Sequence, residues 1–556
     1  MGIFINIKRT GFYNDLSNKK QDEYLSLSRD KILPFVDTLY YSVFIYNDGT
    51  DEVNSSIKPF IHTLENLQMA AVQSRESVQY NDNLLMTFKR FSQYSFCLTA
   101  SDLYDVFICR AFVRDSPRIV VQLRSFGLWT VGVEEIFENS YNEVKNILSA
   151  YDLSIGRIQE TRIDYCYHTN AISSPNALFK EMRSGVIKNL YTNLSRVHLT
   201  ADTQRDDNGT KLFKDYVCFG EKQSNNVRAR IYDKVKEVIE MGYKNFFFNI
   251  WYDNGLVSYY DKWCMEYAFP YNNQDYLHKA RIAFYVEHMK DIVCIRDVGY
   301  VEDVKDISEN FESAYAGNLI DIYSRLELYK QLLDNPLTSL IKFKEVADEY
   351  MPQVTAILNI EYETKRKFYY YSDDFINGFK TLNREYMQEY DPLMNRIYKM
   401  LDNKSIFLDY LTSKTLTFHR GDLDENGEPK YLSWWKRLRN VNLGGIKSDQ
   451  KLIREYSYNM DKKHVLRRMI NSVAAAAVYD DRLETGFIED LSDELSNLND
   501  NNAHKLYFVD YEGVIIDEIN SGLFSDYKII KAKKELHLRN RKKKQGNINI
   551  QEKKQE

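Results

Sequence analysis

One short segment of the chain combines a tyrosine with three cations. Within residues 227–234, apolar residues alternate with a second set of long polar side chains: Arg228, Arg230, Tyr232 and Lys234. Because side chains alternate between the two faces of a strand, a strand here places one phenol among these cations. Such a face suits a phosphodiester, since the cations attract and hold the phosphate and the phenol is positioned to attack it. We therefore predict that Tyr232 is a nucleophile and that the other three side chains clamp the phosphate.

Two further predicted strands supply carboxylates. In the strand 161–169, Arg162, Asp164 and His168 share one face. In the strand 263–269, Glu266 is the single carboxylate among mostly apolar residues, so its burial requires a cation, a metal or an exit to solvent. Hard divalent ions take oxygen ligands, and we predict one Mg²⁺ or Mn²⁺ held by Asp164, Glu266 and His168. The structural alternative is an Arg162–Asp164 pair, a histidine at the core edge and a salt bridge of Glu266.

Composition indicates a globular protein with several domains. The chain has 556 residues, of which 44% are hydrophobic, and this is enough for more than one core. The net charge of −6 is unevenly distributed, because residues 528–556 contain eleven Lys or Arg and three Glu. Six scattered cysteines and the lack of a long apolar run predict a cytosolic protein without a membrane partner.

The pattern along the chain predicts an α+β fold, with an antiparallel-sheet catalytic domain followed by a mainly helical C-terminal region. Strands are expected at 36–45, 84–98, 105–112, 118–124, 161–169 and 216–234, and a helix at 133–151. The predicted divisions are an N-terminal arm at 1–35, the catalytic domain at 36–285, a helical region at 286–420, a C-terminal region with basic and acidic segments at 421–526, and a basic tail at 527–556.

Several of these motifs occur together in one known family. Arg162-Ile163-Asp164, then Arg230-Ile231-Tyr232-Asp233-Lys234 after a turn with Gly220 and Ser224, then Trp263 and Glu266, resemble the Rep_trans family of replication initiation factors in order and spacing. These proteins initiate rolling-circle plasmid replication or act as relaxases of integrative conjugative elements. The resemblance covers about residues 36–285.

The resemblance implies an origin-specific DNA nickase that depends on a metal. Its tyrosine, here Tyr232, attacks one strand, forms a 5′-phosphotyrosyl bond and leaves a free 3′-OH. The implied partners are origin DNA, as a hairpin or single strand, and a second copy of the chain in a homodimer. A host helicase is also implied, because the sequence has no phosphate-binding loop of the G-x-x-x-x-G-K-[ST] type.

Three departures from the family pattern keep alternatives open. The turn before Tyr232 is one residue longer, which predicts a bulge and leaves open whether Arg228 or Arg230 faces the phosphate. His168 and Cys264 replace the acidic residue and the arginine of the family, and they favour a noncatalytic DNA-binding or regulatory protein on the same fold. A third alternative is a host-interaction or structural protein. The Trp434-Trp435 pair near Lys436 and Arg437 either stacks on DNA or packs a helix.

Overall fold

The computed structural model describes residues 12, 16, 18–88, 94–113, 116–183, 188–191, 216–219, 227–293, 313–370, 373–382, 391–423, 429–446 and 452. The chain divides into two compact units, Met1–Arg454 and Glu455–Glu556. All described residues belong to the first unit. The predicted basic tail, and the part of the predicted C-terminal region beyond residue 452, lie outside the described residues.

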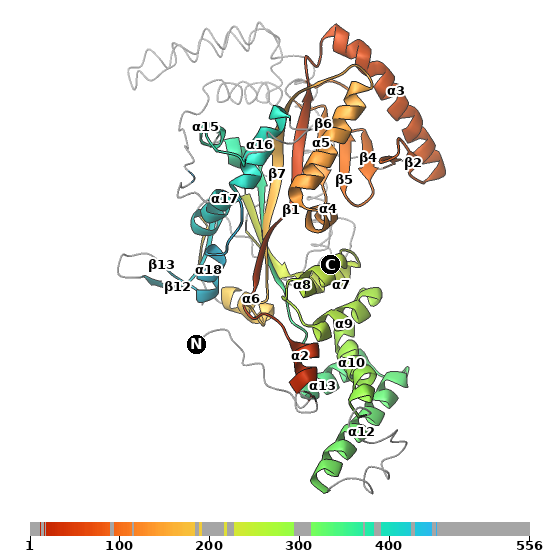
Figure 1. Ribbon diagram of the computed structural model, residues 1–556, viewed down its shortest axis with the longest axis vertical. Coiled ribbons are helices and arrows are strands. Elements are labelled where there is room, and N and C mark those ends of the chain that lie inside the picture. The colour runs from red at the N-terminus through yellow and green to blue at the C-terminus, as the bar shows by residue number, and fades with distance from the viewer. Residues whose placement is uncertain are drawn as a thin grey trace, which may run out of the picture. The chain divides into compact units, whose positions relative to one another are not determined.

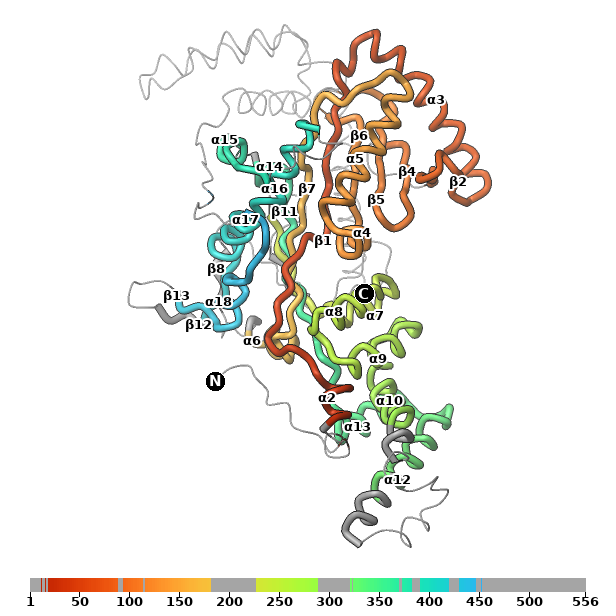
Figure 2. The backbone as a smooth tube through the Cα atoms, viewed as in Figure 1, coloured from red at the N-terminus to blue at the C-terminus, as the bar shows by residue number. Residues whose placement is uncertain are grey.

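A ten-stranded antiparallel sheet forms the framework of the first unit (Figure 1). Its strands in spatial order are β2 (Val78–Gln79), β3 (Leu85–Thr87), β4 (Phe96–Ala100), β5 (Tyr104–Ile108), β6 (Ile119–Leu123), β1 (Ile32–Ile45), β7 (Ile155–Thr169), β11 (Leu358–Lys365), β10 (Val227–Asp233) and β9 (Tyr216–Phe219). The sheet and the helices that cover it confirm the predicted α+β class. Figure 2 shows that β11 lies beside β7, although about 190 residues separate them in the sequence.

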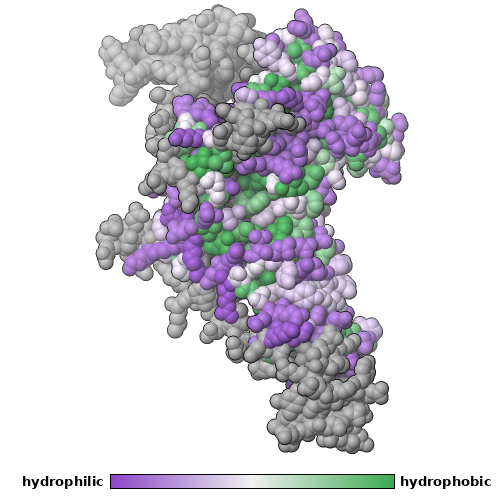
Figure 3. Space-filling view, in the orientation of Figure 1, coloured by the Kyte–Doolittle hydropathy of each residue, from purple (hydrophilic) through white to green (hydrophobic). Residues whose placement is uncertain are grey.

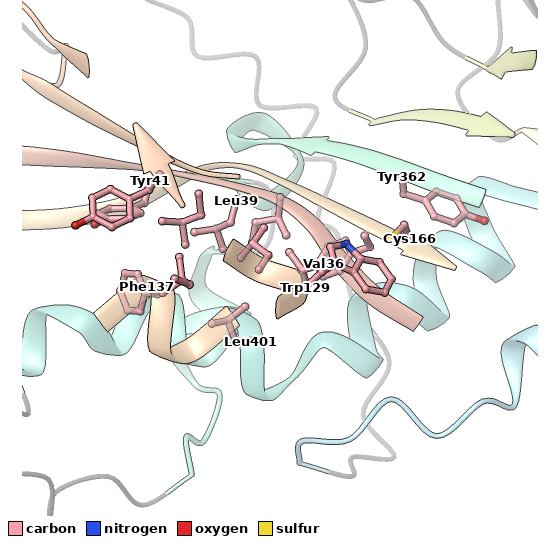
Figure 4. Packing of buried hydrophobic residues seen from close by; sticks show 14 of the residues in the cluster. Val36, Leu39, Tyr41, Trp129, Phe137, Cys166, Tyr362 and Leu401 are labelled. Atoms are coloured by element: carbon pink, nitrogen blue, oxygen red, sulfur yellow. The ribbon is translucent and has the colours of Figure 1, made fainter. Parts of the chain in front are cut away.

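One face of the sheet carries the main apolar core. Leu39 and Tyr41 of β1 face α5 (Val133–Ser149) and α16 (Asn395–Asp402), where Figure 4 shows Phe137 and Leu401. The rings of Tyr41 and Phe137 meet edge to face, with centroids 5.2 Å apart. The helix predicted at 133–151 is therefore confirmed, and its apolar stripe is buried against β1 as its period required.

The helix α3 (Asp51–Ser74) begins at an N-cap, Thr50, whose side chain accepts a hydrogen bond from the Val53 amide. Its buried residues include Ile57, Phe60 and Leu64, which repeat at helical spacing. The surface at the upper right of Figure 3, where Figure 1 places α3, is mainly hydrophilic. The helix therefore covers the core on one side and faces solvent on the other.

The segment predicted as the strand 263–269 is a helix, and that prediction was wrong. The helix α9 (Tyr259–Ala268) starts with a capping box, in which Ser258 and Asp261 exchange hydrogen bonds between side chain and backbone. Its buried residues include Tyr260, Cys264 and Ala268, which recur every four positions as one helix face. On that face, Tyr260 and Cys264 belong to a second apolar cluster, and Ala268 belongs to the main core. The second cluster also includes residues of α2 (Asn18–Leu25), α10 (Tyr276–Val293), α12 (Ser313–Asp334) and α13 (Leu340–Tyr350).

The region predicted as helical at 286–420 contains α12, α13 and α16, but it also contains two strands. One is β11, in the middle of the main sheet, and the other is β12 (Leu416–Leu423) of a three-stranded sheet with β8 (Lys188–Tyr191) and β13 (Pro429–Tyr431). Both strands belong to the unit Met1–Arg454, so the division between the two compact units falls at residue 454 and not at 285. Among the described residues, no helix combines the length and the apolar character needed to span a membrane.

The two tryptophans of α18 (Ser433–Arg439) pack inside the protein. Both side chains are buried, and their rings meet edge to face with centroids 5.3 Å apart. The indole N–H of Trp435 donates to the carbonyl of Thr412 at 3.2 Å, and its ring meets Phe418 of β12 at 4.7 Å. The packing alternative is therefore correct, and these rings do not form a surface for stacking DNA bases.

We expect Trp435→Ala to lower the free energy of unfolding by about 3–5 kcal/mol, because it leaves a large cavity in a closed core. Arg437→Ala is the matched control on the same helix, since Arg437 is exposed and pairs with Asp30 at the surface. That change is expected to cost less than about 1 kcal/mol. Urea unfolding followed by circular dichroism measures both, and equal midpoints for the two variants would contradict this packing.

Candidate functional site

The register of three neighbouring strands places the predicted nucleophile beside buried carboxylates. In β10, Tyr232 lies opposite Asn359 of β11, and Arg230 lies opposite Glu361. In turn, Glu363 of β11 lies opposite Asp164 of β7. Since alternate residues share a face, these polar side chains gather on the face of the sheet opposite the main core. The pairing of β10 with β11 has no register shift from 227 to 233, so the bulge expected near Tyr232 is absent from this strand.

Three side chains form hydrogen bonds with the hydroxyl of Tyr232. The hydroxyl donates to Oε2 of Glu361 at 3.0 Å, and it accepts from Nδ2 of Asn359 at 2.8 Å and from Nζ of Lys234 at 3.2 Å. A phenol has one donor and two acceptor positions, so this arrangement uses its full capacity. The Tyr232 side chain is also only 7% exposed. The phenol is therefore held in a fixed position by a carboxylate and two donors.

The charges around this phenol define how its proton can leave. Burial raises the pKa of Tyr232 well above its usual value, and the carboxylates Glu237 and Glu361 raise it further against the pull of Lys234 and Arg230. Burial disfavours the charged form of Glu361, but Arg230 together with Lys234 and Lys244 outweighs this effect and lowers the pKa of Glu361. The phenol is thus protonated at neutral pH, and the ionised carboxylate nearest to it is the group able to accept its proton.

Lys234 reaches the phenol because the strand ends directly before it. The side chain of Asp233 accepts hydrogen bonds from the amides of Val235 and Lys236, and this N-cap starts the helix α7 (Lys234–Met241). The ammonium of Lys234 pairs with Glu237 at 2.6 Å, one helical turn further on. Burial disfavours the charge of Lys234, but Glu237 and Tyr232 outweigh it and raise the pKa of the ammonium. Lys234 is therefore a buried, charged partner of the phenol, as its place in the motif predicts.

Both candidate arginines of β10 lie on the face of Tyr232. Arg230 forms an ion pair with Oε1 of Glu361, and Arg228 occupies the position opposite Glu363. Beside them, Arg162 donates from Nε to Asp164 at 2.8 Å and also contacts Glu363 at 3.3 Å. The structural alternative given for this strand, an ion pair of Arg162 with Asp164, is therefore present. The site thus interleaves arginines with carboxylates across β7, β11 and β10.

His168 belongs to an aromatic cluster. Its ring stacks on Trp129 of α4 (Ser125–Thr130) at 4.7 Å, and its Nδ1 accepts a hydrogen bond from the indole of Trp251 at 3.0 Å. Phe247 of α8 (Phe246–Asp253) packs against it edge to face at 5.0 Å. Burial lowers the pKa of His168 to about 3, so the imidazole is neutral at neutral pH. The structural alternative of a core histidine is correct.

This burial predicts a loss of stability in mild acid. The pKa of His168 is about 3 in the folded state and about 6.5 in the unfolded chain, so the histidine contributes stability above pH 6.5 that is lost progressively toward pH 3. Between pH 7.5 and pH 5 the contribution of His168 to this loss is about 2 kcal/mol. The carboxyl of Asp164, whose pKa burial raises to about 7, acts in the opposite direction, so the prediction concerns the difference between variants. Urea midpoints at both pH values test it: the wild type should lose about 2 kcal/mol more than His168→Gln over this range, and His62→Gln, at an exposed histidine, should behave as the wild type does. A pH dependence unchanged by His168→Gln would contradict the assignment.

Glu266 does not join the site. It lies on α9 with its side chain 51% exposed, and its partner is Lys262 at 3.7 Å, one turn earlier on the same helix. The predicted set of Asp164, Glu266 and His168 therefore does not assemble as a metal site. No other group of three His, Cys, Asp or Glu side chains within the described ranges is arranged to hold a metal ion. Cys264, the other departure from the family pattern, is buried in the second apolar cluster.

The sequence reasoning missed Asn359, Glu361 and Glu363, the polar residues of β11. A signal was present, because Leu358, Ile360 and Tyr362 alternate with them at the period of a strand. The charged helical sequence around this short segment concealed it. The carboxylate expected on a strand beside the tyrosine is thus Glu361 and not Glu266.

Comparisons with known proteins give a weak likeness to a solved structure. No protein-family model matches the chain, and no curated protein matches it. Among solved structures, the chain is similar to a rolling circle replication initiator protein from Geobacillus stearothermophilus, with a TM-score of 0.31 and 10% sequence identity. The match covers 74% of this chain and 96% of that chain. A likeness this low carries no argument, so the function must be inferred from the side chains around Tyr232.

Proposed function

We propose that this protein nicks single-stranded DNA at an origin by transesterification through Tyr232. The observation that carries the proposal is the hydroxyl of Tyr232, which donates to a buried carboxylate while an ammonium and an amide donate to it. A nucleophile within hydrogen-bond reach of its base, in a field of cations, is the arrangement that covalent phosphate chemistry requires. The sequence resemblance to Rep_trans initiators and relaxases supports the same reaction.

In the proposed reaction, the Tyr232 oxygen attacks the phosphorus and its proton passes to Glu361. The bond from phosphorus to the 3′ oxygen breaks, which leaves a 3′-OH after protonation and a 5′-phosphotyrosyl bond. Arg228, Arg230 and Lys234 attract the phosphate and balance the charge that develops on its oxygens. The break starts replication or conjugative transfer, and reversal of the same steps rejoins a strand when the process ends.

DNA binding must change the contacts of the phenol. Each lone pair of the Tyr232 oxygen accepts a hydrogen bond, from Asn359 or from Lys234, so one of these donors must leave before the oxygen can bond to phosphorus. Lys234 is suited to this exchange, because its ammonium can transfer from the phenol to the incoming phosphate. We propose that phosphate binding thereby releases the nucleophile.

A divalent ion remains part of the proposal on the resemblance alone. Of the predicted ligands, Asp164 and His168 lie on the face of Tyr232, but the carboxylate of Asp164 is engaged by Arg162 and the ring of His168 is packed among aromatic rings. Because the residues present do not form the predicted ligand set, we derive no step through a metal. A host helicase and a homodimer are likewise partners that the resemblance alone suggests.

The test uses a supercoiled plasmid that carries the gene with its flanking DNA, incubated with the protein and Mg²⁺ or Mn²⁺. The expected result is conversion to the open circle, with protein attached to the 5′ end at one site, next to an inverted repeat. Primer extension locates the break. Specific binding to this DNA without any break would overturn the proposed nickase.

A second candidate is a noncatalytic DNA-binding protein on the same fold, and the burial of Tyr232 favours it. In that case the phenol is a structural member of the β10–β11 pairing and never meets DNA. The two candidates differ in one outcome of the plasmid assay, since only the nickase leaves a covalent 5′ adduct.

A further inference from the structure

We infer that an aromatic rim beside Tyr232 stacks the unpaired bases that flank the bound phosphate. The rim is formed by Phe126, Tyr243 and Phe246, and the inference rests on the proposed DNA-nicking function. Phe126 belongs to α4, Tyr243 to the turn between α7 and α8, and Phe246 is the first residue of α8.

Direct contacts join the two elements of the rim. The rings of Phe126 and Phe246 meet edge to face at 5.3 Å, and the ammonium of Lys244 donates to the hydroxyl of Ser125 at 3.0 Å. Lys244 also faces Asp37 of β1 at 3.8 Å. Gly242 closes the turn with φ of +66°, and a Cβ at this position would overlap the side chain of Asn272. The turn is therefore held against α4 in one conformation.

The rim continues into the site of Tyr232. Phe246 packs on Phe247 at 4.4 Å, and the ammonium of Lys234 lies 5.3 Å from the centre of the Phe247 ring. The same ammonium donates to the Tyr232 hydroxyl. Burial raises the pKa of Tyr243, and Glu237 raises it further while Lys234 acts against it. A strand whose phosphate meets Lys234 would therefore pass its adjacent bases over the rim.

Exposure separates the rim from the aromatic residues of the core. Tyr243 is 44% exposed and Phe126 is 38% exposed, whereas Phe247 and Trp251 beneath them are buried. Exposed rings beside buried cations offer the two parts of a single-strand site, since cations hold the backbone and flat rings hold the bases. Stacking of this kind accepts any base, so it would position the strand without reading its sequence. The occupant that this surface fits is unpaired DNA on either side of the phosphate.

The test measures binding of two probes by fluorescence anisotropy: a dT 20-mer and an abasic 20-mer with the same phosphates. All proteins carry Tyr232→Phe, so that cleavage does not interfere. The parent protein, which carries Tyr232→Phe and an unchanged rim, should bind the dT 20-mer at least tenfold more tightly than the abasic 20-mer, since stacking contributes about 1–3 kcal/mol per base. Tyr243→Ala and Phe126→Ala should each weaken dT binding at least fivefold and leave abasic binding unchanged. Tyr243→Phe, which keeps the ring, should bind as the parent does.

Tyr46→Ala is the matched control, because Tyr46 is a tyrosine that is 61% exposed and directly follows the C-terminal end of β1. It should change neither affinity. Two results would overturn the inference that the rim stacks bases: equal affinities of the parent for the dT and abasic probes, or an equal loss of affinity for both probes in Tyr243→Ala. If the parent shows no salt-dependent binding to either probe while the plasmid assay also shows no break, the proposed function itself fails. Nicking together with equal probe affinities would refute the rim and leave the nickase in place.

Discussion

Tyr232→Phe is expected to abolish formation of the covalent DNA adduct, with a fall in nicking of more than about 10³-fold. The reason is chemical, because phenylalanine keeps the ring in its buried position and removes only the oxygen that bonds to phosphorus. The plasmid assay gives the rate, and a denaturing gel with labelled DNA gives the adduct. DNA binding should change little, since Arg228, Arg230 and Lys234 remain.

Tyr362→Phe is the matched control for this prediction. Tyr362 is a buried tyrosine of β11 on the opposite face of the sheet, in the main apolar core. Its loss removes a hydroxyl of the same kind from a neighbouring strand, so nicking should stay within about twofold of the wild type. Thermal melting of both variants separates loss of chemistry from loss of fold. A Tyr232→Phe protein that still forms the adduct would contradict the assignment of the nucleophile.

Glu361→Gln is expected to slow nicking by about 10²–10⁴-fold, the usual contribution of a positioned general base. The amide can still accept the hydrogen bond from Tyr232, but it cannot take the proton of a phenol whose pKa is raised well above its usual value. The measurement is the single-turnover nicking rate with DNA in excess of its dissociation constant. A fall in rate at unchanged DNA affinity identifies a role in the chemical step.

Two controls accompany Glu361→Gln. Glu266→Gln removes the carboxylate that the sequence alone suggested, and it should leave the nicking rate unchanged because Glu266 pairs only with Lys262 among its described contacts. Since the buried Arg230 loses its partner in Glu361→Gln, some loss of stability is expected, and unfolding midpoints must show that the variant is folded at the assay temperature. A Glu266→Gln protein that fails to nick, beside an active Glu361→Gln protein, would reverse this assignment.

The strand of the tyrosine was predictable because its pattern is local. Alternation of Val227, Ala229 and Ile231 with Arg228, Arg230 and Tyr232 specifies a strand with one apolar face, and β10 has this form. The same reasoning gave β7 and the Arg162–Asp164 pair. Each of these features depends on residues two apart in the sequence.

One error concerns a contact between residues far apart in the sequence, and the other concerns the start of a helix. Whether Glu361 is buried depends on Arg230, which is 131 residues away, and the charged sequence around β11 concealed its alternation. The four residues Trp263–Glu266 fit the period of a strand as well as that of a helix, so a strand was predicted where the helix α9 lies. The capping box at Ser258 and Asp261 favours the helix. Local spacing identified the nucleophile, but the position of its base depended on the packing of the sheet.

The most direct measurement is the identity of the residue that carries the DNA. After nicking, nuclease and trypsin digestion should yield the peptide of residues 231–234, which contains a single tyrosine, with a nucleotide attached. Tandem mass spectrometry then places the phosphate on a residue. We predict the modification on Tyr232, and a nucleotide found on any other residue, such as the exposed Tyr243, would contradict the account.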